Sequence, residues 1–136
     1  MTGFVQAKGG KGRILIIEDE ADIVEVLSKR FEREGYEVLS AFTGPEGLAK
    51  AKAELPNLII LDILIPEMDG FAVFRNLKRK GDVGADTSGI PVVVLTAMGS
   101  DLRPMFEVEG VREYLEKPFD AVALVRKVEE ILASPK

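Results

Sequence analysis

Residues 58–62 read Leu-Ile-Ile-Leu-Asp, a run of bulky apolar side chains that ends on a single carboxylate. Two other runs share this character, ILII at residues 14–17 and VVVL at residues 92–95. A strand with one face in water alternates apolar and polar residues, so runs that are apolar throughout indicate strands covered on both faces. Shorter apolar runs at residues 38–39 and 114–115 complete the set. Together they predict a central parallel sheet.

Amphipathic helical patterns separate the predicted strands. In the first pattern Ile23, Leu27 and Phe31 recur at helical spacing and form a stripe that can pack on the sheet. Gly35 then offers a C-terminal stop, because glycine readily adopts the left-handed conformation that ends many helices. We expect this helix to pack on the sheet through that stripe.

The second helix is predicted to begin at residues 43–46, where a threonine and a glutamate have capping-box spacing and a proline lies in the first turn. We expect Leu48, Ala49 and Ala53 to form its apolar face.

Three more helices follow the same logic. A third is expected over residues 68–80 and a last over residues 121–133; a fourth, over residues 100–108, is a poorer pattern because Pro104 is tolerated only near a helix start. The expected inward side chains are Phe71, Phe74 and Leu77 in the third helix and Leu124, Val128 and Ile131 in the last. Strands alternating with helices in this way predict a doubly wound α/β domain with right-handed crossovers and helices on both sheet faces.

Length and composition limit the domain organisation. The chain has 136 residues, of which 46% are hydrophobic, enough for one buried core but too short for two ordinary domains. We expect residues 13–134 to form that domain, preceded by a flexible Gly/Lys-rich arm at residues 1–12 and followed by a short tail at residues 135–136. Residues 81–89 have no apolar periodicity, which predicts a mobile surface loop.

Charge and residue usage narrow the function classes. The formal net charge of −5 disfavours direct binding to nucleic acid or to an anionic membrane. The sequence has no cysteine, which removes disulfides and thiolate metal sites and suits a reducing cytoplasm. It has no apolar run near the roughly 20 residues that span a bilayer, and its start lacks the apolar segment of a signal peptide. We therefore expect a cytoplasmic protein without direct nucleic-acid or membrane partners.

Polar side chains stand where four of the predicted strands end. They are Glu18, Asp19 and Glu20 after the first strand, Asp62 after the third, Thr96 at the end of the fourth and Lys117 after the fifth. In open α/β sheets, the carboxyl ends of the strands form the functional crevice. Carboxylates held together raise one another's pKa, so the cluster favours a bound cation. Mg²⁺ fits best, because it is commonly held by one or two carboxylates together with water and phosphate oxygens.

This chemistry suggests a nucleophile. An aspartate beside Mg²⁺ can attack phosphorus and form an acyl phosphate while the metal and fixed donors neutralise the transferring oxygens. Asp62 is the candidate, with Thr96 as a hydroxyl donor and Lys117 as a positive charge suited to phosphate. Each residue also has a plainer interpretation: a turn residue, a strand-end hydroxyl and a solvated charge, with residues 18–20 as the start of the first helix.

The site residues belong to four sequence blocks: ILIIEDE at residues 14–20, LDILIPEMDG at residues 61–70, LTA at residues 95–97 and KPF at residues 117–119. In this order the blocks resemble those of response-regulator receiver domains of two-component systems, of the chemotaxis-regulator type, over about residues 13–134. The resemblance implies a flavodoxin-like α/β fold: a five-stranded parallel sheet of strand order 2-1-3-4-5.

The resemblance also implies a role for each metal-site residue. Asp62 would be the phosphoacceptor and a metal ligand. Asp19 would bind Mg²⁺ directly, Glu18 would bind it through water, and Leu64 would contribute its backbone carbonyl.

On the phosphoryl side, the resemblance implies that Thr96 and Lys117 contact the transferred group. Tyr114 matches an aromatic switch position whose side chain turns inward when Thr96 is drawn toward phosphate. The bond between Lys117 and Pro118 would be cis.

Some positions depart from the family pattern. Leu64 and Met98 occupy the two positions that flank the phosphoryl group, and because both are apolar we expect a long-lived phosphoaspartate. The residue 81–89 link is longer than usual in the family, and Pro104 is unusual on the face that members use to signal.

The implied function is a signalling switch that catalyses its own phosphorylation and slow dephosphorylation. The donor would be the phosphohistidine of a sensor histidine kinase or of a histidine phosphotransfer protein. A downstream protein would bind the face of the fourth helix, fifth strand and fifth helix. A stand-alone receiver and a piece of a longer regulator or hybrid kinase both fit the sequence.

Three other functions fit the sequence less well. A phosphatase of the haloacid dehalogenase type needs a second aspartate two residues after the first, where this chain has Leu64. An FMN carrier needs a Ser/Thr/Gly-rich phosphate loop after the first strand, where residues 18–20 would repel the phosphate. A degenerate receiver that only binds proteins is disfavoured by the intact acidic cluster with Thr96 and Lys117.

Overall fold

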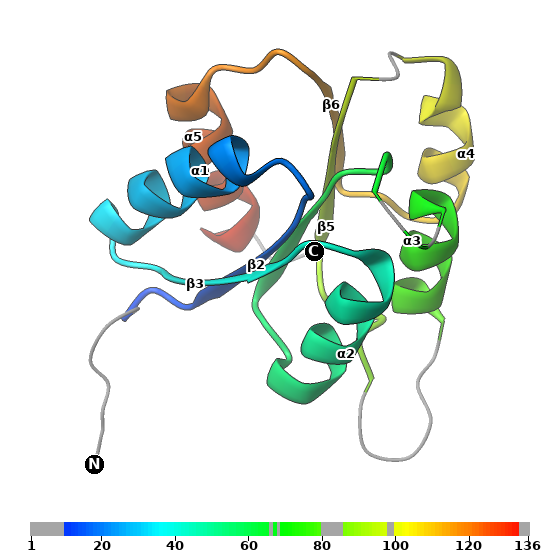
Figure 1. Cartoon of the computed structure of the whole chain (residues 1–136), viewed down its shortest axis with the longest axis horizontal. Coiled ribbons are helices and arrows are strands. Elements are labelled where there is room, and N and C mark those ends of the chain that lie inside the picture. Colours follow the sequence, from blue (N-terminus) through cyan, green and yellow to red (C-terminus); the bar gives the residue numbers. More distant parts are fainter. Residues whose placement is uncertain (1–9, 66, 68, 80–85, 98–99, 134–136) are drawn as a thin grey trace.

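The computed structural model of the chain describes residues 10–65, 67, 69–79, 86–97 and 100–133. The strands within them are β2 (Arg13–Ile17), β3 (Glu37–Ala41), β4 (Leu58–Leu61), β5 (Val92–Thr96) and β6 (Glu113–Glu116). These form a five-stranded parallel sheet in the order β3-β2-β4-β5-β6 (Figure 1). Counted along the chain this is the order 2-1-3-4-5, so the flavodoxin-like topology is confirmed.

Helices cover both faces of this sheet (Figure 1). On one face lie α1 (Ala21–Arg33) and α5 (Ala121–Ala133). The other face carries α2 (Gly44–Glu54), α3 (Gly70–Lys78) and α4 (Arg103–Val108), which a 3₁₀ turn at Ser100–Leu102 precedes. Each helix of the described residues is too short or too polar to cross a membrane.

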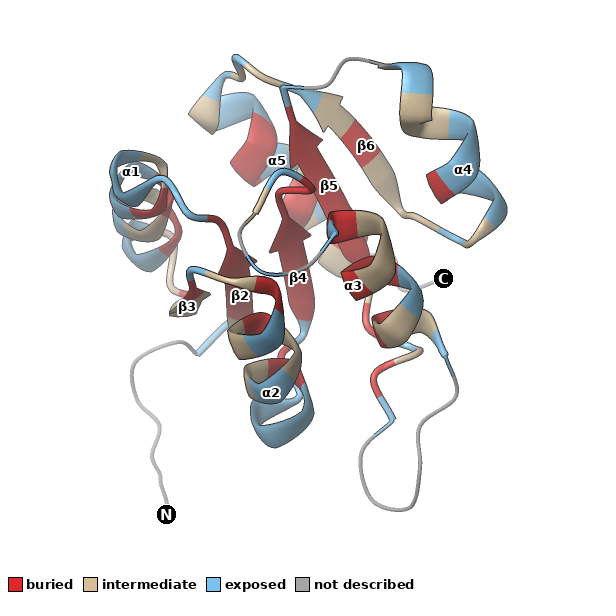
Figure 2. Ribbon diagram, turned by 45° about the vertical axis from the view of Figure 1, so that its right-hand side comes forward, coloured by how far each residue is buried: buried red, intermediate tan, exposed pale blue. Residues whose placement is uncertain are grey.

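The apolar runs form the centre of the molecule because both of their faces are covered. Along β2, Leu15 and Ile17 pack toward α2 and α3, whereas Ile14 and Ile16 pack toward α1 and α5. Figure 2 shows β4 and β5 as buried, and both are buried along their whole length. The prediction from uninterrupted apolar runs is confirmed.

Most helix predictions agree with the structure. In α1, Leu27 and Phe31 are buried, and Gly35 follows the helix in the left-handed region at φ +105°. The last predicted helix has the bounds of α5, and its predicted stripe is buried. Pro104 lies in the first turn of α4, the one place where its missing N–H costs no helical hydrogen bond.

The predicted apolar face of α2 is correct only for Leu48, which is partly buried against the core. Ala49 and Ala53 are exposed, and the buried positions are Gly44, Gly47 and Ala51. The cause is the close approach of this helix to the sheet: a Cβ at residue 47 would lie 2.5 Å from the Ile17 Cδ1 atom. A pattern that counts apolar side chains misses a face made largely of glycine. The predicted cap is present, since the Thr43 hydroxyl accepts the backbone N–H of Glu46 at 3.2 Å.

The third helix is shorter than residues 68–80. It begins at Gly70 because the Asp69 carboxylate accepts the backbone N–H of Phe71 at 2.9 Å and caps the helix, and it ends at Lys78. Met68 and Lys80 lie outside the described residues.

Two predicted mobile segments are described only in part. In the predicted loop at residues 81–89, the described end is anchored, since the buried Thr87 hydroxyl donates to the Leu77 carbonyl at 2.7 Å. In the predicted arm at residues 1–12, the Lys11 N–H donates to the Gly35 carbonyl at 3.2 Å. Residues 1–9 and 80–85 lie outside the described residues.

The start of α3 supports the loop that follows β4, and this contact allows a test of the packing. A Cβ added to Gly70 would lie 2.2 Å from the Ile63 Cα atom, which is backbone and has no rotamer to move to. We expect Gly70→Ala to lower the free energy of unfolding by about 3 kcal/mol in urea titrations. Gly89→Ala is the matched control, because nothing lies within 4 Å of its added Cβ. Equal stabilities of the two variants would contradict this packing.

Candidate functional site

The sheet brings the predicted site residues together at the carboxyl ends of its strands. One backbone hydrogen bond past each strand end continues the parallel register. The Glu18 N–H donates to the Ala41 carbonyl at 3.0 Å, and the Asp62 N–H donates to the Ile17 carbonyl at 2.9 Å. In the same way, the Lys117 N–H donates to the Thr96 carbonyl at 2.8 Å. These backbone hydrogen bonds therefore set the positions of the side chains, independently of contacts between the side chains themselves.

Lys117 is the centre of the site's charge interactions. Its ammonium lies 3.0 Å from Asp62 Oδ2 and 3.1 Å from Glu18 Oε1. Both carboxylates are almost fully buried, with 3% of Asp62 and 2% of Glu18 exposed. Glu20 Oε1 approaches the same ammonium from the exposed side at 3.4 Å. Two buried carboxylates thus share one lysine.

Backbone donors hold the second oxygen of each buried carboxylate. Asp62 Oδ1 accepts the N–H of Leu64 at 3.0 Å, and Glu18 Oε2 accepts the N–H of Glu20 at 3.1 Å. Each carboxylate is therefore fixed in position by one backbone N–H and by the Lys117 ammonium. Burial of such charges is costly unless they are paired and hydrogen-bonded in this way.

Three carboxylates of the site form a possible cation-binding group. One oxygen from each of Glu18, Asp19 and Asp62 can be chosen so that all lie within 4.8 Å of one another. Asp19 is exposed, whereas the other two are buried, so the group opens to solvent on one side. An all-oxygen donor set of this kind suits a hard divalent cation.

The electrostatics of the group indicate unbalanced negative charge. Burial, followed by the Asp62 charge, raises the pKa of Glu18 to about 7 from its ordinary value of 4.5. Burial opposes the charged form of Lys117, but its hydrogen bonds to Asp62 and Glu18 outweigh this and raise its pKa further above the ordinary value. Lys117 therefore stays charged, and it does not fully offset the repulsion between the buried carboxylates.

The remaining predicted residues are placed as follows. Thr96 is fully buried at the end of β5, and Tyr114 in β6 is 1% exposed, so its ring already lies inside the domain. The Lys117–Pro118 peptide bond is cis. Leu64 points outward and is 52% exposed. Met98 lies outside the described residues.

Sequence reasoning assigned no role to two residues that contact the site or its predicted switch. Glu20 contacts Lys117, although only Glu18 and Asp19 of this stretch were expected to take part in the site. Arg103 of α4 lies over the Tyr114 ring at 5.0 Å and donates to the Tyr114 carbonyl at 2.7 Å. Tyr114 also packs against Phe106, with ring centroids 5.5 Å apart. Such contacts depend on how α4 packs on the sheet, and the sequence holds no signal for them.

A comparison with protein families identifies the family of the chain that forms this site. Residues 14–129 match the model of the response regulator receiver domain. The chain belongs to this family. Receiver domains bind Mg²⁺ at an acidic pocket, and this receiver domain has an acidic group of Glu18, Asp19 and Asp62. Membership decides against the haloacid dehalogenase-type phosphatase and the FMN carrier.

Individual relatives agree with the family match. The chain is 34% identical to Protein PilH of Pseudomonas aeruginosa over 122 residues, which are 89% of this chain and 98% of PilH. It is 39% identical to the regulator RpaA of Synechocystis sp., covering 88% of this chain but 48% of RpaA. The chain thus spans about half the length of several curated relatives that it matches.

Solved structures show the same fold. The CheY-like response regulator receiver domain protein from Methanospirillum hungatei superposes with a TM-score of 0.82 at 30% sequence identity. The match covers 95% of this chain and 97% of that one.

The raised pKa of Glu18 leads to a test. Asp62→Asn removes the neighbouring negative charge, so we expect the Glu18 pKa to fall from about 7 in carboxyl-detected NMR titrations without divalent cations. Asp101→Asn is the control and should leave the value at about 7, because Asp101 is an exposed carboxylate outside the acidic group. Equal Glu18 pKa values in wild type and Asp62→Asn would contradict the charge coupling.

The same pKa sets the sign of a stability change. The folded chain holds the Glu18 proton more tightly than the unfolded chain, whose glutamate titrates near 4.5. In metal-free protein the contribution of Glu18 to stability therefore falls as the pH rises from about 4.5 to about 7.

Proposed function

We propose that this receiver domain accepts a phosphoryl group on Asp62, with Mg²⁺ bound beside it, from the phosphohistidine of a sensor histidine kinase or of a histidine phosphotransfer protein. The observation that carries the proposal is the buried Asp62 carboxylate, held 3.0 Å from the Lys117 ammonium within the acidic group. A carboxylate in a plain turn has no need of a partly buried lysine. Here the lysine and the acidic group serve one reactive position.

The transfer step balances without a further reactant. An Asp62 carboxylate oxygen forms the new bond to phosphorus as the phosphorus–nitrogen bond of the donor breaks, and the donor imidazole leaves with the electron pair and takes up a proton from solvent water. Little covalent chemistry is required of the protein, so positioning and electrostatic stabilisation supply the catalysis. The backbone N–H of Leu64 holds one Asp62 oxygen and so fixes the direction of the carboxylate.

Mg²⁺ would be held by Asp19 and Asp62 directly, by Glu18 through water and by the Leu64 backbone carbonyl. When bound, the ion supplies positive charge to the transferring oxygens. The raised pKa of Glu18 supports a cation here, since the buried carboxylates repel each other even with Lys117 present.

Lys117 and Thr96 would act on the phosphoryl oxygens. Lys117 pairs with Asp62 in the unphosphorylated chain, so after transfer its ammonium is already at the position where the new negative charge appears. The Thr96 hydroxyl would be a second donor from the end of β5. Movement of Thr96 toward phosphate would be reported by Tyr114 on the next strand, whose ring packs against Phe106 of α4.

The output would pass through the face of α4, β6 and α5 to a downstream protein. Synechocystis RpaA is named a DNA-binding regulator, and this chain covers 48% of it. For this chain, a cytoplasmic location and the absence of direct nucleic-acid and membrane partners stay predictions. The degenerate receiver is the weaker candidate, because Asp62, Lys117 and the acidic group are all in place.

Acetyl phosphate, a small phosphoryl donor, tests the proposal without knowledge of the cognate kinase. With Mg²⁺, intact-mass measurement should show one phosphoryl adduct on the wild-type chain. Asp62→Asn should show none, because the amide is not a nucleophile toward phosphorus. Asp101→Asn is the matched control, since Asp101 is an exposed carboxylate outside the acidic group, and it should be labelled like wild type.

Two outcomes would contradict the proposal. An adduct of equal yield on Asp62→Asn would move the acceptor to another residue. An unlabelled wild-type chain, with a thermal unfolding curve that shows it folded, would favour the degenerate receiver.

A further inference from the structure

A hollow lies at the opposite end of the sheet from Asp62. Its volume is about 640 Å³, within the range of small-molecule sites. Asn57, Pro91 and Arg112 line it, and each directly precedes a strand, respectively β4, β5 and β6. Because β5 has five residues and rises about 3.3 Å per residue, roughly 16 Å of strand separates this hollow from the acidic group. It is therefore a separate site.

Two cationic side chains line this hollow, Lys78 from the end of α3 and Arg112 from the start of β6. Among the described residues that line it there is no carboxylate. This is unusual for a chain of net charge −5, in which acidic residues outnumber basic ones. A concave site lined by one sign of charge concentrates ions of the other sign.

The two cations repel each other within the hollow. Burial and the nearby Arg112 charge both lower the pKa of Lys78 from its ordinary value. A bound anion would offset this repulsion, in the same way that Lys117 offsets the repulsion between Glu18 and Asp62 at the other end of the sheet.

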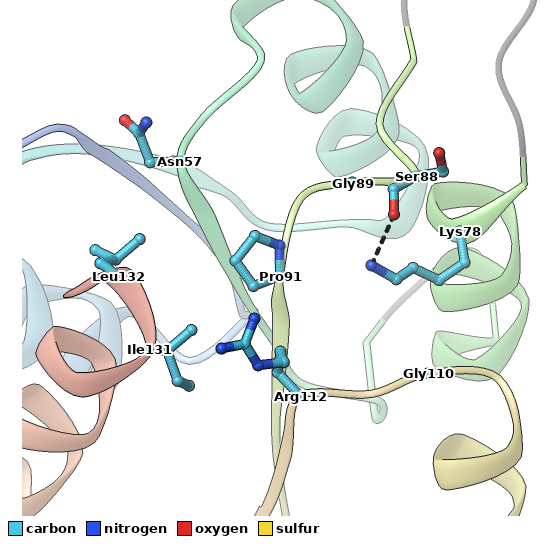
Figure 3. A pocket seen from close by; sticks show the side chains of 9 residues that line it. All are labelled: Asn57, Lys78, Ser88, Gly89, Pro91, Gly110, Arg112, Ile131 and Leu132. Atoms are coloured by element: carbon cyan, nitrogen blue, oxygen red, sulfur yellow. Dashed lines mark hydrogen bonds between the residues drawn. The ribbon is translucent and has the colours of Figure 1, made fainter. Parts of the chain in front are cut away.

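Lys78 also has a structural role, which does not use all of its N–H donors. Its ammonium donates to the Ile90 carbonyl at 2.7 Å and to the Ser88 carbonyl at 3.1 Å, the second of which Figure 3 shows. An ammonium has three N–H donors, and a guanidinium has five, so both side chains can contact a ligand while keeping protein partners. The bonds to carbonyls fix the Lys78 head at the hollow.

The rest of the hollow adds an apolar wall. In Figure 3, Lys78 lies on one side of Pro91, and Ile131 and Leu132 of α5 lie on the other. The Arg112 head group lies on the side of Ile131, close to Pro91 in this view. The geometry points to a binding site for a small organic phosphate, with the phosphate between Lys78 and Arg112 and an apolar group against Pro91 and Ile131. A phosphate monoester carries two negative charges, so it suits a pair of cations better than a carboxylate ligand with one charge does.

Phenyl phosphate carries both features and is the probe. We expect saturable shifts of amide resonances in NMR titrations without Mg²⁺, concentrated at Ser88, Gly110 and Arg112. Arg112→Gln should raise the dissociation constant about tenfold, because a charge-assisted contact is lost. Arg126→Gln is the matched control, since it removes an exposed arginine of α5 that does not line this hollow, and it should leave the dissociation constant unchanged.

Two comparisons complete the test. Inorganic phosphate should bind more weakly than phenyl phosphate if the apolar wall contributes, and equal affinity would reduce the site to one for free phosphate. Asp62→Asn should bind phenyl phosphate like wild type, so failure of the phosphoacceptor proposal leaves this one standing. Absence of saturation, equal weakening by Arg126→Gln, or shifts centred on Asp62 and Lys117 would overturn the organic phosphate site.

Discussion

The contact of the Lys117 ammonium with two buried carboxylates is the interaction on which the functional end of the molecule depends. Asp62 and Glu18 lie side by side because β4 and β2 pair in parallel, and nothing in that pairing favours two negative charges there. The lysine makes their burial tolerable, although burial and then the Asp62 charge still raise the pKa of Glu18 to about 7. The excess negative charge is what a divalent cation would neutralise. The same excess of negative charge therefore explains both the contacts of Lys117 and the proposed binding of Mg²⁺.

The sheet makes this arrangement possible at low cost. Each functional residue follows a strand whose side chains are buried on both faces, so the backbone cannot slip by one residue without exposing apolar surface. The strand-end hydrogen bonds then carry the register on to Glu18, Asp62 and Lys117. A rigid apolar core therefore positions a polar site that would not assemble on its own.

Sequence reasoning succeeded where a single physical cause acts over a short stretch. Uninterrupted apolar runs indicated the strands, and residue spacing indicated the bounds of α5. It failed where packing between distant elements decides, as on α2, whose inward face is built around Gly47 rather than around Ala49 and Ala53. The proposed site residues could be named from the sequence because they stand at strand ends and family motifs mark them. Arg103 over Tyr114 and the Lys78–Arg112 hollow follow from tertiary contacts, for which no sequence pattern exists.

The most direct measurement for the central claim is chemical mapping of the phosphoryl group. Borohydride reduces an acyl phosphate on aspartate to homoserine, and peptide sequencing by mass spectrometry then locates the altered residue. After treatment with acetyl phosphate and Mg²⁺, the account predicts homoserine at position 62 and aspartate unchanged at position 19. Homoserine at position 19, or at any position other than 62, would contradict it.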